Sequence, residues 1–304
     1  MNFYANLHTH STHSDGQYSP SQLARVAYDE GYKAIAITDH DTITAYPELK
    51  AACKKIGMEC IFGTEFTTLS DELNRAFHLT AFHFDPEEPR IKEYLRQLSF
   101  NETNQTKILF ERGLREGLIT GITWEEVLEY NKTITWLCNN HVFEAMKAKG
   151  LKTNEQYLDF YRSVYGSRRK EVPKVYPLKQ AKELISLIRE AGGIVFIAHP
   201  HEQFAYLDTL TAWGIQGLEV WHPGLNEAEK QEALRIAKEK KLFISGGSDH
   251  HGLCGGLYKA VDNPETSQYY LPPLSQGTTK AFFDEIKTTT LRADRNEWID
   301  EYLK

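Results

Sequence analysis

The sequence is short of the features that mark membrane proteins and disulfide-bonded secreted proteins. No apolar run approaches the roughly 20 residues that a membrane-spanning helix needs. The N-terminus lacks the basic and apolar regions of a signal peptide. Only 4 of the 304 residues are cysteines, and none forms a Cys-x-x-Cys pair, so neither a disulfide framework nor a thiolate zinc site is indicated. We therefore expect a cytoplasmic protein with reduced cysteines.

Positive charge is also in short supply. The 35 lysines and arginines are outnumbered by 42 aspartates and glutamates, which gives a formal net charge of −7. Long nucleic acids are bound by neutralising many phosphates with basic side chains, so an acidic chain is a poor match for them. The expected partner is a small phosphorylated substrate, nucleotides included; long nucleic acid and membranes are not expected. The sequence gives no indication of the oligomeric state.

Short apolar runs alternate with helical patterns towards both ends of the chain, which is typical of an α/β protein. The expected strands cover residues 3–7, 34–38, 60–62, 77–82, 194–198, 217–221 and 242–245. From about residue 86 to 180 this alternation gives way to helical patterns, at 91–116, 123–126, 138–149 and 155–165. The predicted organisation is a first barrel part (1–85), a helical insertion or cap (86–177), a second barrel part (178–277) and a C-terminal helix with a polar tail (278–304).

Histidines and carboxylates stand at or near the ends of nearly all of these strands. The first strand is followed by His8, His10 and Asp15, and later strands lead to further groups of the same kind: Asp39, His40, Glu65, His78, His199, His201, His222, Asp249 and His251. Parallel α/β architectures collect such residues at the carboxyl ends of their strands, and a closed barrel brings all of those ends around one mouth. Imidazoles with a few carboxylates suit manganese, iron or zinc. The pattern predicts a metal site in a barrel mouth.

Taken in order, these motifs resemble those of the PHP (polymerase and histidinol phosphatase) family: His8-x-His10, Asp15, Thr38-Asp39-His40, Glu65, His78, His199-Pro200-His201 and Ser248-Asp249-x-His251. The resemblance covers residues 1 to about 85 and about 178 to 256. Within the family the chain is similar to bacterial phosphoesterases related to nucleoside 3′,5′-bisphosphate phosphatase and to the 5′-to-3′ exoribonuclease, which also carry a helical insertion here. The resemblance implies a distorted (β/α)7 barrel with two or three divalent metal ions (Mn, Fe or Zn) in its mouth.

The resemblance also implies a ligand set for each ion. His8, His10, Glu65 and Asp249 would hold one ion; Glu65, shared, with His78 and His199 would hold a second; and Asp15, His40 and His251 would hold a third. A hydroxide that bridges two of the metals would attack phosphorus, which is the chemistry of two-metal hydrolytic sites.

Several neighbouring residues have two interpretations. His83 lies five residues beyond His78, but Phe77-His78-Leu79 matches the strand of the family, so His78 is the preferred ligand. His201 and His222 could each protonate the leaving alkoxide, or could instead hydrogen-bond a ligating carboxylate.

Two carboxylates are expected to contact the metal-ligating histidines without binding a metal themselves. Asp39 and Glu219 each stand beside a histidine motif or strand end. Carboxylates next to metal-ligating histidines commonly orient the imidazole rings. We therefore expect Asp39 and Glu219 to orient imidazoles.

The cap holds the candidate substrate-binding residues. Where the relatives carry Arg-Pro-His or Arg-Thr-His, this chain has Asn139-Asn140-His141, so a neutral amide replaces a guanidinium that can bind phosphate at two points. Asn139 and His141 stay candidates for substrate contact. Arg168 and Arg169 could supply the missing charge, or could belong to a solvated turn.

The function that these observations predict is that of a metal-dependent hydrolase of phosphate monoesters, acting on a small metabolite or nucleotide. One alternative is a 5′-to-3′ exonuclease that removes nucleotides from RNA or DNA ends. Another, from a different class, is a non-catalytic metal- or phosphate-binding module. A module of that kind is expected to have gaps in its ligand set, whereas every position is filled here.

Overall fold

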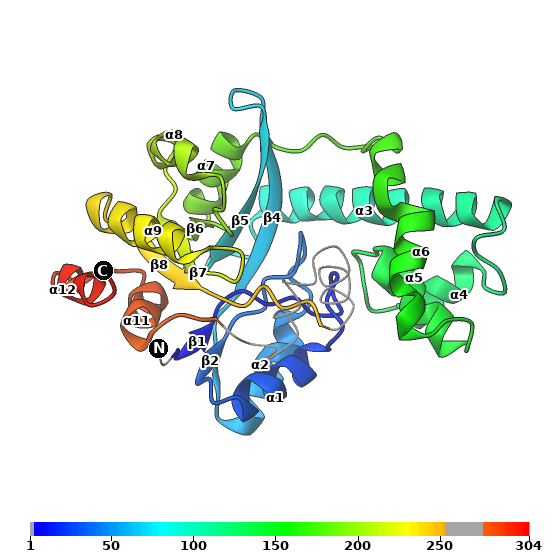
Figure 1. Ribbon diagram of the computed structural model, residues 1–304, viewed down its shortest axis with the longest axis horizontal. Helices are drawn as coiled ribbons and strands as arrows, with labels where there is room; N and C mark the ends of the chain where they lie inside the picture. The colour runs from blue at the N-terminus through cyan, green and yellow to red at the C-terminus, as the bar shows by residue number, and fades with distance from the viewer. Residues whose placement is uncertain (1–2, 253–275, 304) are drawn as a thin grey trace.

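The computed structural model of the protein describes residues 3–252 and 276–303 (Figure 1). Cys254 and part of the predicted segment 178–277 lie outside the described residues. The described chain folds into a strand-containing body and a helical cap that extends from it, on the right in Figure 1. We keep the name cap for residues 86–177.

The N-terminal part of the body is a small parallel sheet covered by two helices. Its strands are β1 (Ala5–Asn6), β2 (Ala34–Ile35) and β3 (Glu59–Cys60), in that order. The helices are α1 (Pro20–Asp29) and α2 (Tyr46–Ile56). Ser19 caps α1 with Pro20 in its first turn, and α2 ends at Gly57, whose φ of 71° suits glycine.

The larger sheet is mixed and has five strands in the described chain. They are β4 (Gly63–Ser70), β5 (Arg75–Phe82), β6 (Ile194–Ile197), β7 (Gly217–Trp221) and β8 (Phe243–Gly246). Around this sheet lie α7 (Ala181–Glu190), η4 (Phe204–Tyr206), α8 (Leu207–Ala212) and α9 (Glu227–Glu239), seen on the left in Figure 1. The apolar side chains of these helices and of β5 to β8 form the main hydrophobic core.

The β4–β5 hairpin was not predicted. A strand was expected over residues 60–62 and none between it and residue 77, but β4 is a strand of its own that pairs antiparallel with β5, with Glu65 opposite Thr80. The hairpin turns near Asn74, whose φ is 47°. β4 was not predicted because its sequence lacks the apolar–polar alternation of a half-buried strand. Its polar residues, Glu65 among them, are almost all buried.

Hydrogen bonds join the two sheets at their edges, around the ends of β1 and β2. His40 and Glu65 form a parallel bridge, and Thr9 and His250 form another. The backbone N–H of Leu7 donates to the carbonyl oxygen of Gly246 at 3.2 Å. The observed fold is thus an arrangement of two sheets, one parallel and one mixed, with helices around them. The described strands do not show closure into one (β/α)7 barrel, which stays a prediction.

The cap is helical, as predicted. Its elements are α3 (Pro89–Arg115), α4 (Trp124–Tyr130), α5 (Asn139–Ala148), η1 (Asn154–Gln156), α6 (Tyr157–Phe160), the π-helix η2 (Tyr161–Tyr165) and η3 (Gly166–Glu171). The 27-residue α3 serves two cores: Leu95 and Leu98 pack into the main core, whereas Leu109 and Phe110 pack into a separate core of the cap. This helix ties the cap to the body, and the boundary at residue 86 stays a prediction.

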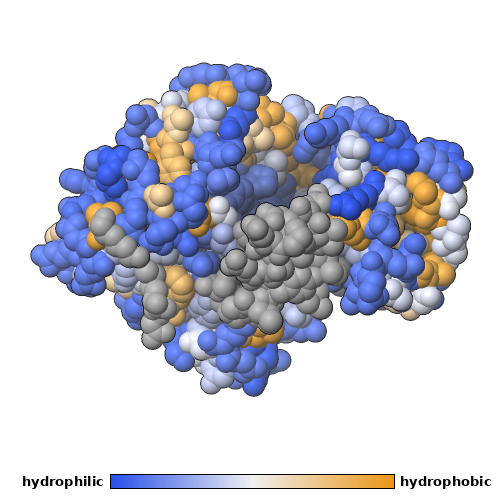
Figure 2. Space-filling view, in the orientation of Figure 1, coloured by the Kyte–Doolittle hydropathy of each residue, from blue (hydrophilic) through white to orange (hydrophobic). Residues whose placement is uncertain are grey.

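The C-terminal segment holds two helices, α11 (Lys280–Thr288) and α12 (Arg295–Asp300), where one helix and a polar tail were expected. A buried ion pair of 3.1 Å between Arg295 Nε and Glu285 Oε1 joins them, which explains how a polar segment folds against the body. No helix among the described residues combines the length and the apolar character that crossing a membrane requires. Hydrophilic residues predominate on the face shown in Figure 2, where apolar residues form small separate groups.

Candidate metal centre

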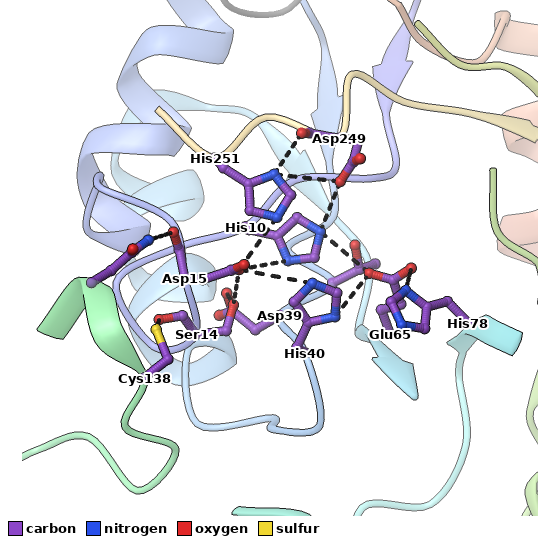
Figure 3. A network of polar contacts seen from close by, with 12 residues as sticks. His10, Ser14, Asp15, Asp39, His40, Glu65, His78, Cys138, Asp249 and His251 are labelled. Atoms are coloured by element: carbon purple, nitrogen blue, oxygen red, sulfur yellow. Dashed lines mark hydrogen bonds and ion pairs between the residues drawn. The ribbon is translucent and has the colours of Figure 1, made fainter. Parts of the chain in front are cut away.

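Glu65 lies at the centre of a cluster of imidazoles and is fully buried. Its Oε2 atom faces three ring nitrogens: His8 Nε2 at 3.3 Å, His10 Nε2 at 3.4 Å and His40 Nδ1 at 3.2 Å. Its Oε1 atom faces two others: His78 Nδ1 at 3.2 Å and His199 Nε2 at 3.0 Å. The two oxygens of one carboxylate therefore serve two different groups of imidazoles (Figure 3).

Two aspartates extend the cluster on the side of His10. Asp249 Oδ1 lies 3.1 Å from His10 Nε2 and 3.5 Å from His251 Nδ1. Asp15 Oδ1 lies 3.3 Å from His251 Nε2 and 3.8 Å from both His10 Nδ1 and His40 Nε2. All nine sequence-predicted metal ligands are thus brought into one cluster.

The arrangement fits divalent ions. Two ligand atoms, each about 2.1 Å from one ion, lie roughly 3.0–3.4 Å apart at octahedral or tetrahedral angles, close to most of the distances above. Both ring nitrogens of His10, and Nδ1 of His78, are buried without a hydrogen-bond partner. Unsatisfied buried nitrogens are costly, and a cation would satisfy them. Four overlapping groups of these side chains could each hold an ion: His10–Asp15–His40–His251, His8–His10–Asp249, His8–Glu219–His222 and His40–Glu65–His78.

The electrostatics of the cluster favour the deprotonated forms of Glu65 and His10. Burial raises the pKa of Glu65, but the imidazoles of His8 and His40 outweigh it and hold that pKa well below its usual range. Burial, together with His251 and His40, lowers the pKa of His10 to about 3. A carboxylate and a neutral imidazole are the forms in which these side chains bind metal ions.

The backbone at the cluster is conformationally unusual. His199 and Asp249 have φ values of 31° and 50°, in the left-handed region that residues other than glycine rarely occupy. Such conformations cluster at functional sites, where the surrounding structure holds them in place. A Cβ at Gly247 would lie 2.3 Å from the Cβ of His8, and one at Gly16 would lie 2.1 Å from the carbonyl oxygen of His10. Glycine is therefore required beside both histidines.

Glu219 lies where sequence analysis expected an orienting carboxylate. Its Oε1 atom is 3.0 Å from His8 Nδ1, and its Oε2 atom accepts from the backbone N–H of His199 at 2.6 Å. Asp39 behaves differently from the expectation. It accepts from the N–H and the hydroxyl of Ser11 and from the hydroxyl of Ser14, each at 2.6 Å. Asp39 therefore holds the loop that carries Asp15, because its three close donors all come from Ser11 and Ser14 of that loop.

The two candidate general acids differ in environment. His222 is buried; its Nδ1 accepts from the backbone N–H of Gly224 at 2.9 Å, which leaves a proton on Nε2, 3.3 Å from Asp249 Oδ2. His222 Nε2 thus faces a candidate ligating carboxylate but makes no hydrogen bond to it in the described structure. His201 is half exposed, with Nδ1 2.5 Å from Glu229 Oε1. A role as general acid stays a prediction for both.

His78 contacts Glu65, which favours it over His83. His83 follows β5 in a left-handed conformation, with φ 62°. Burial lowers the pKa of His83. The choice made from the strand motif thus agrees with the position of His78 in the cluster.

The predicted substrate-binding residues are engaged within the protein. Arg168 pairs with Glu116 at 2.5 Å, beyond the end of α3, and is not brought to the histidine cluster. Arg169 pairs with Glu102 at 2.6 Å and lies 3.5 Å from Asn139 Oδ1.

His141 is engaged at both ring nitrogens. Its Nδ1 accepts from the backbone N–H of Cys138 at 2.9 Å, so its Nε2 carries the proton that faces the carbonyl oxygen of Thr12 at 3.0 Å. Contact of Asn139, His141, Arg168 and Arg169 with substrate stays a prediction.

Sequence analysis missed Trp136, which lies at the contact between cap and cluster. Its ring stacks on that of His40, with centroids 6.1 Å apart and an interplanar angle of 28°. Trp136 is largely buried, at 7% exposure. A lone aromatic residue between two helices gives no signal in the sequence, since only the fold brings it to His40.

The family model described as PHP domain matches residues 6–172, more than half of the chain. The chain belongs to the PHP family. The match includes most of the cap as well as the first barrel part. The chain is 28% identical to a 5′-3′ exoribonuclease of Haemophilus influenzae over 264 residues, covering 83% of this chain and 91% of the relative.

Two further relatives of this PHP protein are informative. It is 26% identical to the phosphoribosyl 1,2-cyclic phosphate 1,2-diphosphodiesterase of Eggerthella lenta, covering 82% of this chain and 94% of the relative. A crystal structure of a candidate metal-dependent phosphoesterase from Bifidobacterium adolescentis superposes with a TM-score of 0.72 at 26% identity, covering 95% of this chain and 97% of the other. Family, fold and cluster together assign the chain to the metal-dependent phosphoesterases.

Proposed function

We propose that this protein hydrolyses a phosphate monoester of a small metabolite or nucleotide at the cluster around Glu65. The observation that carries the proposal is the position of Glu65, whose two oxygens face two separate groups of imidazoles at 3.0–3.4 Å. A carboxylate shared between neighbouring ions is a feature of two-metal hydrolytic sites.

The proposed ligands are those that the PHP resemblance implies. His8, His10, Glu65 and Asp249 would hold one ion; Glu65, His78 and His199 a second; and Asp15, His40 and His251 a third. Bound ions of this kind polarise phosphoryl oxygens and make a bound water a good nucleophile at neutral pH.

The remaining residues of the site would position the metal ligands or protonate the leaving group. Glu219 orients His8 and fixes the backbone at His199 through its two oxygens. His222 is buried with its Nε2 3.3 Å from Asp249 Oδ2, whereas the half-exposed His201 is the imidazole with freer access to a leaving alkoxide. The cap, which reaches the cluster through Trp136, would exclude water and select the substrate.

The charge of the cap supports a small substrate. Four cations of the cap are paired with carboxylates: Arg112 with Glu171, Lys149 with Glu126, Arg168 with Glu116 and Arg169 with Glu102. Binding of a long strand depends on many unpaired cations. The net charge of −7 points in the same direction.

A second candidate is hydrolysis of a phosphodiester. It is favoured by the names of two relatives, an exoribonuclease and a cyclic phosphate diphosphodiesterase. The same ions and ligands would serve either ester, so the choice depends on how the cap receives the leaving group.

The test is release of inorganic phosphate by manganese-loaded protein from nucleoside 3′,5′-bisphosphates, nucleoside monophosphates, sugar phosphates and histidinol phosphate. A short 5′-phosphorylated RNA and a phosphoribosyl cyclic phosphate test the diester candidate, with products separated by chromatography. Asp249→Ala is the inactive variant, and Glu72→Ala is the matched control because Glu72 is an exposed carboxylate in the β4–β5 turn.

Release from a monoester by wild type and Glu72→Ala, but not by Asp249→Ala, supports the proposal. Products from the RNA or the cyclic phosphate alone would replace it with the diester candidate. Unchanged metal content in Asp249→Ala would overturn the ligand assignment, and silence on the whole panel would favour the non-catalytic module.

A further inference from the structure

The first turn of the cap helix α5 rests on the loop that carries Asp15. The side-chain amide of Asn140 donates from Nδ2 to the backbone carbonyl oxygen of Asp15 at 2.5 Å. A residue of the cap therefore holds the backbone of a candidate metal ligand directly.

Two neighbours of Asn140 hold the same loop. His141 Nε2 donates to the carbonyl oxygen of Thr12 at 3.0 Å, and Cys138 Sγ lies 3.9 Å from the carbonyl oxygen of Ser14. Both Cys138 and His141 are buried, at 2% and 5% exposure. The carbonyl groups of Thr12, Ser14 and Asp15, all in one short loop, thus contact side chains at the start of one helix. The loop is therefore held by several contacts and not by Asn140 alone.

The orientation of the Asn140 amide is fixed from the cap side. Its Oδ1 accepts from Asn139 Nδ2 at 2.8 Å and from the hydroxyl of Tyr157. The hydroxyl of Tyr157 in turn accepts from Asn139 Nδ2 at 2.9 Å. With the oxygen occupied by two donors, the Nδ2 group is the end of the amide that faces Asp15.

The position of Asp15 depends on contacts of this kind because it lies on a loop. On the body side, Asp39 anchors Ser11 and Ser14 of that loop. On the cap side, Asn140 anchors Asp15 itself. The carboxylate of Asp15 is 29% exposed and sits 3.3–3.8 Å from three imidazoles, so a small shift of its backbone would remove it from the group.

We propose that Asn140 is a positioning residue, which sets the affinity of the ion held by Asp15, His40 and His251 by fixing the backbone of Asp15. The cap thereby controls the occupancy of one ion and leaves the ions around Glu65 to the body. This inference rests on the proposed function for its metal centre and adds a role of the cap in metal binding.

The experiment is a titration of metal-free protein with Mn²⁺ in equilibrium dialysis, with bound metal measured by mass spectrometry. Asp15→Ala is the reference, because it removes the ligand and should abolish one class of binding. Asn140→Ala should raise the dissociation constant of that same class about 10–100-fold, the usual effect of removing a group that orients a ligand. The tighter classes should be unchanged.

Two further variants keep the test specific. Tyr157→Phe leaves the amide but removes a hydroxyl that orients it, so it should weaken the same class by a smaller factor. Lys147→Ala, in the last turn of α5, removes an ammonium group that pairs with Glu144 and lies over the ring of Phe143, and should bind as wild type does.

The outcomes separate the two proposals. If Asp15→Ala loses a class of ions while Asn140→Ala and Tyr157→Phe bind as wild type does, the positioning role is overturned and the metal centre stands. An equal loss of every class in Asn140→Ala, with Tyr157→Phe unaffected, also overturns it, since the effect is then on folding. Wild-type binding in Asp15→Ala removes Asp15 from the ligands, and the inference with it.

Discussion

His8 and Glu219 form a buried pair, with Nδ1 of the imidazole 3.0 Å from Oε1 of the carboxylate. The second oxygen of Glu219 accepts from the backbone N–H of His199 at 2.6 Å. One carboxylate therefore orients the ring of His8 and fixes the backbone of His199, two candidate ligands that face different oxygens of Glu65.

Replacing Glu219 by glutamine should weaken metal binding about 10–100-fold, because the amide can accept only one of these two contacts and directs a donor at the other. Equilibrium dialysis with Mn²⁺ measures the change, and phosphate release should fall in parallel when metal is limiting. Glu72→Ala is again the control. Equal metal affinity in Glu219→Gln and wild type would contradict the orienting role.

Gly247→Ala should displace His8. The added methyl would lie 2.3 Å from the Cβ and 2.4 Å from the backbone nitrogen of His8, so the two segments must separate. Such overpacking costs about 1–3 kcal/mol of unfolding free energy, which urea denaturation measures. Metal affinity should fall as well. Gly150→Ala is the control: its φ is +71°, no atom would meet its methyl within 4 Å, and it should lose stability without losing metal.

The metal-free protein should be most stable near the ordinary histidine pKa of 6.5. Below that pH the unfolded chain protonates His10, whereas the folded chain, with a His10 pKa of about 3, does not, so stability falls as the pH decreases. On the other side, His8 and His78 have raised pKa values. Burial opposes this, but the carboxylates of Glu219 and Glu65 outweigh it at His8, and that of Glu65 does so at His78. Their stabilisation is present below pH 6.5 and is lost as the pH rises through the folded values.

The measurement is urea unfolding of EDTA-treated protein between about pH 4.5 and 9, with a slope of up to about 1.4 kcal/mol per pH unit for each group. Added Mn²⁺ should reverse the decline on the alkaline side, since ions bind the deprotonated imidazoles. A midpoint that stays constant over the whole range would show that the cluster is not coupled to folding in this way.

Arg169→Ala should lower the free energy of unfolding more than Arg168→Ala does, because Arg169 pairs with a buried carboxylate and Arg168 with an exposed one. Arg169 pairs with Glu102, which is 10% exposed, so its loss leaves a largely buried carboxylate without its partner. We expect a cost of about 1–3 kcal/mol. Arg168 pairs with the exposed Glu116, and its removal should cost less than about 1 kcal/mol.

Michaelis constants for the best monoester test the substrate role of the same two arginines. Phosphate contact predicts that the constant rises in the variant. An unchanged constant in both variants would end that interpretation and leave Asn139 and His141 as the remaining predicted contacts.

The metal cluster could be predicted from the sequence because its residues carry unusual chemistry at regular positions. His8-x-His10 follows one strand, and Asp249 and His251 follow another. Their positions after strand ends were therefore enough to predict that they lie close together. Asp39 was assigned wrongly since the sequence shows its neighbour His40 but not the hydroxyls of Ser11 and Ser14 that fold back onto it. Trp136 and Asn140 were out of reach because their roles depend on how the cap meets the body.

The hydrogen bonds between the two ends of the cluster bear on how the protein is made. The backbone N–H of Asp249 donates to the carbonyl oxygen of His8 at 2.9 Å, and the amide of Asn6 donates to the hydroxyl of Ser248, 242 residues away. During synthesis, the N-terminal histidines leave the ribosome long before these partners do, and contacts of such sequence separation form late in folding. The nascent chain thus carries His8 and His10 with Asp15 and Glu65, but without Asp249 and His251, for most of translation. On the ligand set proposed above, the complete cluster would be able to take up its ions only after residue 251 has been synthesised.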